Sequence, residues 1–253
     1  MEIKTFIFLS IACFCAAFLD SVAGGGGLIS LPAFLMAGLP PQIALGTNKL
    51  AASFSSMSSS LKFIHAKKVN LKLIAILAPF SCIGAIIGVK LALVIDSKYL
   101  YPIVLGLLIF TMVYTLMNKK IGGINEFKGI TVKNGAIGSG MATILGCYDG
   151  FFGPGTGSFL IFSLIRIFKF DFIHASGTSK ILNLCSNLVS VVIFVNAGKV
   201  NFFYAFSMAG FMFLGAQVGS RVAISKGTKF IKPIFIGITG IIIIKMVYDF
   251  III

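Results

Sequence analysis

Long, sparsely charged apolar runs recur from one end of this chain to the other, and no other feature restricts its fold as much. Residues 71–95, 99–117 and 202–224 are examples, and each reaches the length of about 18 residues that a helix needs to cross a bilayer. Only 11% of the residues are charged, against about 25% in soluble domains. The sequence therefore predicts a single all-α integral membrane domain that crosses the lipid bilayer several times.

The net charge of +14 would indicate nucleic-acid binding in a soluble protein. Here the basic residues gather in short hydrophilic breaks between apolar runs, as at Lys67, Lys68 and Lys72. Membrane proteins mark their cytoplasmic loops in this way, so we expect a multi-pass protein of the inner (plasma) membrane and no nucleic-acid partner. The five cysteines lie in apolar stretches without metal-binding spacing, and no metal or cofactor is expected.

An internal repeat is visible at an offset of 131 residues, where Gly46-Thr47-Asn48-Lys49 matches Gly177-Thr178-Ser179-Lys180. Lysines, asparagines and prolines further along the chain agree at the same offset. Upstream, an offset of 129 aligns Asp20, Gly24 and Gly26 with Asp149, Gly153 and Gly155. Agreement of charged residues and prolines in register indicates a duplication. We assign residues 1–120 to the first repeat and residues 121–253 to the second.

The repeats have the same order of segments. Each opens with an apolar segment that glycines interrupt, continues with a helix whose start is polar, and ends with two further apolar segments. These are residues 3–19 with 24–27, 44–64, 71–95 and 99–117 in the first repeat, and residues 130–145 with 150–157, 175–196, 202–224 and 230–253 in the second.

The distribution of basic residues distinguishes two topologies. If each repeat crosses four times, the repeats are parallel and nine basic residues face one side against eight on the other. If each opening segment turns back inside the bilayer, the second repeat is inverted and the division is thirteen inside against four outside (Lys4, Lys90, Lys98 and Lys199). The positive-inside rule favours inverted repeats with both termini outside, and eight ordinary spans stay as the alternative. The stretch between Lys133 and Arg166 agrees, because it accommodates two half-helices but not two spans of about 20 residues each.

Glycine-interrupted apolar segments at matching positions of two repeats indicate where a transporter binds its solute. Here they are Asp20-Ser21-Val22-Ala23-Gly24-Gly25-Gly26-Gly27 and Asp149-Gly150-Phe151-Phe152-Gly153-Pro154-Gly155-Thr156-Gly157. Glycine lets the backbone approach a solute closely, and the free N–H groups of a following helix start attract an anion. The simpler interpretation is close packing of helices through small residues.

Lys49 and Lys180 form a second predicted feature, because each stands inside an apolar segment. An ionisable residue within the membrane costs about 3 kcal/mol or more and usually marks function, although a lysine can also extend its ammonium to the interface. Neighbouring hydroxyl and amide groups can donate hydrogen bonds to an oxyanion, whereas the serine-rich face of residues 53–60 is expected to pack helices. The predicted solute-binding residues are Gly24, Gly25, Gly26, Thr47, Asn48, Lys49, Gly153, Gly155, Thr156, Thr178, Ser179 and Lys180.

Asp20 and Asp149 are the acidic residues of the two breaks. Each could carry a proton, serve as the counter-ion of a lysine, or cap a helix. We take both as candidates for coupling transport to protons.

Taken together, the glycine segments and the Gly46-Thr47-Asn48-Lys49 and Gly177-Thr178-Ser179-Lys180 motifs resemble the sulfite exporter TauE/SafE family of membrane permeases over essentially the whole chain. The resemblance implies transport of a sulfur-containing anion such as sulfite, sulfoacetate or a related organosulfonate, and seven to nine spans. A related branch that handles thiosulfate uses site cysteines, and only Cys147 is placed to act in that way here.

We therefore expect a secondary transporter of a small anion that works by alternating access between two repeats. An anion channel, or a carrier of thiosulfate or a small carboxylate, is the alternative. An enzyme is not expected, because the sequence contains no GxSxG or HExxH motif, and without a Walker motif the chain is not expected to use ATP.

Overall fold

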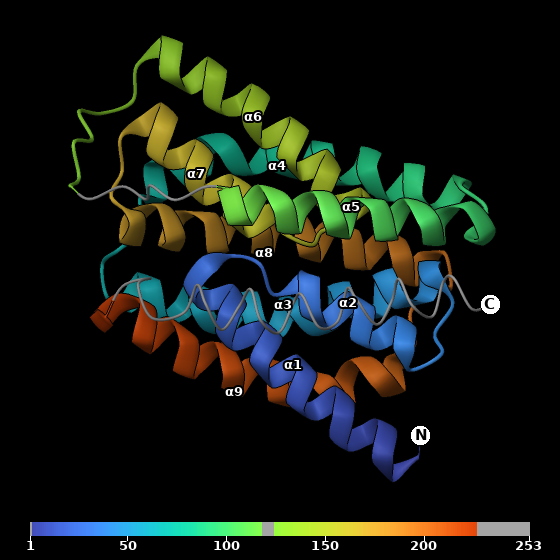
Figure 1. The fold of residues 1–253 in the computed structure, drawn as a ribbon. Coiled ribbons are helices and arrows are strands. Elements are labelled where there is room, and N and C mark those ends of the chain that lie inside the picture. Colours follow the sequence, from blue (N-terminus) through green and yellow to red (C-terminus); the bar gives the residue numbers. More distant parts are fainter. Residues whose placement is uncertain (1, 118–123, 227–253) are drawn as a thin grey trace.

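The computed structural model describes residues 2–117 and 124–226, and the regular elements in this part of the chain are all helices (Figure 1). The boundary expected between the repeats near residue 120 and the last expected segment, residues 230–253, lie outside the described residues. The helices are α1 (Ile3–Ala23), α2 (Gly27–Met36), α3 (Pro41–His65), α4 (Leu71–Val94), α5 (Ser97–Met117), α6 (Val132–Phe151), α7 (Thr156–Phe168), α8 (Phe172–Asn196) and α9 (Phe202–Lys226).

Four described helices, α1, α4, α8 and α9, are long and apolar enough to cross a membrane. Their outward faces carry large exposed side chains such as Ile83 and Ile87 of α4 and Phe203 and Phe206 of α9. A surface of this kind suits contact with lipid rather than water. In contrast, α3 has 25 residues but buries many serines, because it lies between α8 and α9 inside the bundle.

The glycine breaks form two helical hairpins, α1–α2 and α6–α7. Gly24 (φ 79°) ends α1 and Gly153 (φ 95°) follows α6, both in the left-handed region that favours glycine. We expected two half-helices of similar length between Lys133 and Arg166. Instead, the two helices of this hairpin are unequal: α6 has 20 residues and α7 has 13. Helix α6 continues through Asp149 because its helical hydrogen bonds are not interrupted before Gly153, the first glycine in the left-handed region.

Helix contacts recur in pairs when α1, α2, α3 and α4 are matched with α6, α7, α8 and α9. Thus α1 packs on α9 as α6 packs on α4, α3 on α9 as α8 on α4, and α3 and α8 meet each other in the centre. Glycines allow the closest of these contacts: Gly88 of α4 adjoins the carbonyl oxygen of Cys147, and Gly219 of α9 adjoins that of Phe18. A side chain at either glycine would push the helices apart.

The two hairpins enter the bundle from opposite ends (Figure 1). The N-terminus, the start of α3, and the α4–α5 and α8–α9 connections lie at the right end in this view. The start of α6 and the α3–α4 and α7–α8 connections lie at the left end. The two glycine breaks are thereby brought to the interior of the molecule, beside α3 and α8.

Candidate functional site

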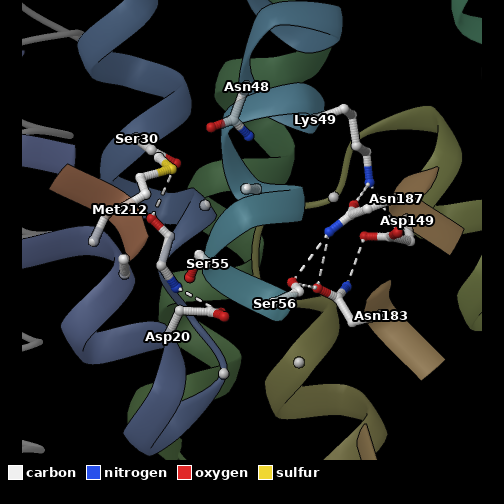
Figure 2. A pocket seen from close by; sticks show the side chains of 18 of the residues that line it. Asp20, Ser30, Asn48, Lys49, Ser55, Ser56, Asp149, Asn183, Asn187 and Met212 are labelled. Carbon is white, nitrogen blue, oxygen red and sulfur yellow. Dashed lines mark hydrogen bonds and ion pairs between the residues drawn. The ribbon is translucent and has the colours of Figure 1, made fainter. Parts of the chain in front are cut away.

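A pocket with about 460 Å³ of empty space, part of it open to solvent, lies between the two glycine breaks and the central helices α3 and α8 (Figure 2). Glycines of both breaks form one part of its wall, and polar side chains of α3 and α8 form another. The pocket therefore joins elements from both halves of the chain.

The two breaks contact each other backbone to backbone. The Ser158 amide donates to the Gly24 carbonyl oxygen at 3.0 Å, and its hydroxyl donates to the Ala23 carbonyl oxygen at 2.7 Å. A Cβ at Gly24 would lie 2.3 Å from the carbonyl carbon of Gly157. A glycine is therefore required at position 24 for two reasons. It adopts the left-handed conformation, and it has no side chain to hold the two backbones apart.

Helix starts supply unpaired donors to the pocket. The N–H groups of Gly27 in α2 and Gly157 in α7 have no hydrogen-bond partner within the described parts of the chain, and both residues line the pocket. Each belongs to a first helical turn, where N–H groups carry the positive end of the helix dipole. The pocket wall is therefore favourable for negative charge on two sides.

Two ion pairs cross between the halves of the chain. Lys49 Nζ lies 2.8 Å from Asp149 Oδ2, and Lys180 Nζ lies 2.6 Å from Asp20 Oδ2. Lys180 also donates to the carbonyl oxygen of Asp20. Because Lys49 and Lys180 are only 3% and 1% exposed, neither extends to the membrane interface, and each aspartate is the counter-ion of a lysine. The two positive and two negative charges cancel.

The two aspartates have different surroundings. Asp149 also accepts from the Ser186 hydroxyl at 2.6 Å and from the Asn183 amide at 3.3 Å, and its side chain is 2% exposed. Asp20 accepts from the Gly26 N–H at 3.3 Å, and its side chain is 19% exposed. Thus Asp149 is enclosed by donors, whereas Asp20 is partly open towards the pocket.

Unsatisfied polar atoms mark the α3 side of the pocket. The Asn48 carbonyl oxygen and the Ser55 hydroxyl are buried without a hydrogen-bond partner, and both residues line the pocket. In Figure 2, Asn48, Ser55 and Ser56 lie between Asp20 on one side and the Lys49–Asp149 pair on the other. Buried polar groups are normally paired, so these groups are suited to a solute or to water.

Half of the predicted solute-binding residues line this pocket, together with both aspartates: Gly24, Gly26, Asn48, Lys49, Gly153 and Gly155. The other half lies behind the wall. The hydroxyl oxygens of Thr47 and Thr178 accept from the backbone N–H groups of Asn201 and Asn70 at 2.9 and 3.4 Å. The remaining residues away from the lining are Gly25, Thr156, Ser179 and Lys180.

Sequence reasoning missed the polar residues Ser55, Ser56, Asn183 and Asn187, all of which line the pocket. A signal was present for the asparagines, because they follow Lys180 at helical spacing and so share a face with it. The serine-rich face does pack helices in part, since Ser59 shares a 2.6 Å hydrogen bond with Ser21. Cys147 is a free cysteine outside the pocket lining, and the described residues contain no cluster of three or more metal-ligating side chains.

Comparison with known proteins agrees with this architecture. Residues 9–246 match the family model described as Sulfite exporter TauE/SafE. A probable membrane transporter protein of a Sinorhizobium species, ORF9, is 38% identical, with 96% of this chain and 92% of that protein covered. Similar proteins are a probable membrane transporter protein of Haemophilus influenzae (36%; 93% and 92%) and the probable membrane transporter protein YfcA of Escherichia coli K12 (35%; 92% and 86%).

No solved structure shows significant similarity to the chain. The family match covers almost all of the sequence, the relatives are named as membrane transporters, and the apolar helices suit a bilayer. This chain is a membrane protein that belongs to the sulfite exporter TauE/SafE family of transporters.

Proposed function

We propose that this protein is a secondary transporter that carries a small anion across the inner membrane by alternating access between two inverted repeats, residues 1–120 and 121–253. The observation that carries the proposal is the pocket, where two opposed half-helix starts and two buried ion pairs meet. A solute site at the junction of repeats, built from interrupted helices, is the usual arrangement in secondary transporters.

The inversion of the repeats is supported by three features. Helix contacts recur under one pairwise matching of the elements, the two hairpins enter from opposite ends, and the basic residues divide thirteen to four in this topology. The crossed pairs Lys49–Asp149 and Lys180–Asp20 follow the same symmetry. Each repeat thus contributes one lysine and one aspartate to the interface between the repeats, where the two would move relative to each other during transport.

An anion fits the donors of the pocket. The N–H groups of Gly27 and Gly157 and the Ser55 hydroxyl have unused hydrogen-bonding capacity. Asn48 lines the pocket beside them, and Lys49 adds positive charge nearby. We propose that the solute contacts these groups and the backbone at Gly24, Gly26, Gly153 and Gly155. The other six predicted residues would shape the wall from behind.

The family match supports a sulfur-containing oxyanion or an organosulfonate, such as sulfite or sulfoacetate, as the solute. Thiosulfate and small carboxylates present similar oxygen atoms and are the alternatives to be tested. Purified protein is first screened for thermal stabilisation by sulfite, sulfoacetate, taurine, thiosulfate and simple carboxylates, because a ligand that binds the folded state raises the unfolding temperature.

Counterflow in proteoliposomes then tests transport. Liposomes loaded with unlabelled sulfite, sulfoacetate or thiosulfate are diluted into a trace of the same labelled anion. A carrier transiently accumulates labelled anion in the lumen above its equilibrium level, because a binding site that carries unlabelled anion out returns with labelled anion. Labelled anion that merely equilibrates indicates a channel, and no uptake of any of the three anions contradicts the proposal.

Two buried serines of α3 provide a matched test of the site. Ser55 and Ser60 both lack a hydrogen-bond partner, but only Ser55 lines the pocket. A hydrogen bond to a charged group contributes about 1.5–3 kcal/mol, so we expect Ser55→Ala to raise the half-saturating anion concentration about tenfold or more. Ser60→Ala should leave it unchanged. Equal effects of the two substitutions would remove Ser55 from the site.

A further inference from the structure

The charges around the pocket balance before any solute enters. Among the described residues, its lining contains Asp20, Lys49 and Asp149, and Lys180 neutralises Asp20 from behind. An anion that entered alone would add an uncompensated negative charge to a poorly hydrated interior, which is costly. A positive charge that arrived with the anion would remove this cost.

A proton on one of the aspartates is the smallest such charge. Protonation of a carboxyl group removes one negative charge and leaves the positive charge of its lysine uncompensated, and that charge attracts the anion. The two aspartates are not equally suited to this role. Asp149 is fixed by Lys49, Ser186 and Asn183 and is almost completely enclosed, so donors already surround it and little of it is open to the pocket.

Asp20 has the opposite character. Its side chain is 19% exposed, it lines the pocket, and Ser55, which aligns with Ser186 at the offset of 131 residues, makes no hydrogen bond to it. The groups around it are Lys180 of α8 and the Gly26 N–H, while Lys49 and Asp149 line the pocket with it. Lys180 keeps the carbonyl oxygen of Asp20 as a partner when the carboxyl group is neutral.

We infer that Asp20 takes up a proton together with the transported anion, which makes this protein a proton-coupled anion transporter. The inference rests on the proposed function and names the coupling ion of the same site. A proton reaches the Asp20 carboxylate from the side to which the pocket opens. The positive charge of Lys180, behind the pocket wall, is then uncompensated and attracts the anion towards the starts of α2 and α7. The proton and the anion leave together after the repeats have rocked.

Proton flux is measured in liposomes that contain pyranine, with the membrane potential clamped at zero by valinomycin and equal potassium. Sulfoacetate and thiosulfate are the probes, because neither buffers strongly near neutral pH; counterflow of the same probes is recorded in parallel. An inward gradient of a transported probe should acidify the lumen. If counterflow occurs and the lumen does not acidify, or if uptake requires sodium instead, the inference is wrong. If neither probe shows counterflow, the proposed function fails for them and the inference falls with it.

Asp20→Asn separates a proton-binding role from a structural one, because asparagine resembles the protonated carboxyl group. We expect the number of protons that enter the lumen per transported anion to fall at least about tenfold in this variant, whatever its rate of counterflow. Equal loss of both activities in a folded Asp20→Asn protein would show that Asp20 only supports the structure. Asp96→Asn, in the α4–α5 connection, is the control and should retain both activities. If Asp20→Asn does not fold, Asp20→Asn with Lys180→Met removes both charges of the pair, and its acidification is compared with its own counterflow in the same way.

Discussion

At the scale of single residues, the Lys49–Asp149 pair is the most completely buried charge interaction in the described protein. Removal of one partner of such a pair leaves an uncompensated charge and costs about 3–5 kcal/mol. We therefore expect Lys49→Met to lower the thermal unfolding temperature in detergent strongly. Lys49→Met combined with Asp149→Asn should recover most of that loss, because no net charge remains buried.

The control for this prediction is Lys90→Met, which removes an exposed lysine of α4 and should change the unfolding temperature little. A double variant that unfolds as early as Lys49→Met alone would contradict the pairing as the source of stability. The comparison of Lys49→Met with the double variant also tests the site. Both are expected to lose transport, but only Lys49→Met is expected to lose stability.

The sequence singled out the two lysines and two aspartates that form the buried ion pairs, but not how they pair. Lys49 and Asp20 belong to one repeat, and a pairing within the repeat would have been the simplest assumption. The crossed arrangement depends on which faces of α3 and α8 meet α6 and α1, and a repeat pattern carries no information on that. For the same reason Ser55 could not be distinguished from the packing serines Ser58 and Ser59.

At the scale of helices, close glycine contacts hold α9 against α1. A Cβ at Gly219 would lie 2.3 Å from the Phe18 carbonyl oxygen, whereas a Cβ at Gly210 of the same helix meets nothing within 4 Å. Crowding in a packed interface costs about 1–3 kcal/mol. Gly219→Ala should therefore lower the unfolding temperature by several degrees, and Gly210→Ala should not; equal unfolding temperatures would contradict the close contact.

Helix positions followed well from the sequence, because apolar periodicity and glycines determine where helices form and end. The start of α4 at Leu71 agrees with the expected segment, and α8 ends at Asn196 as expected. The hairpin limbs were less well predicted. The expected first limb ended at Leu19, but α1 continues to Ala23, since a single aspartate near a helix end does not interrupt backbone hydrogen bonds and a left-handed glycine does.

At the scale of the whole molecule, the inverted and parallel topologies make opposite predictions about the ends of α3 and α8. His65 and Asn196 are counterparts at the offset of 131 residues, both are exposed, and each lies in the last turn of its helix. Inverted repeats place these two residues on opposite sides of the membrane. Parallel repeats place both on the same side as Lys4 near the N-terminus.

Single cysteines at these positions, in a variant whose five native cysteines are replaced, decide between the topologies. A membrane-impermeant maleimide is applied to intact cells and to inverted vesicles. For inverted repeats we expect Asn196→Cys and Lys4→Cys to react from outside and His65→Cys to react only in inverted vesicles, because thirteen basic residues then face the cytoplasm. Reaction of all three cysteines from the same side would require parallel repeats and would remove the symmetry on which alternating access depends.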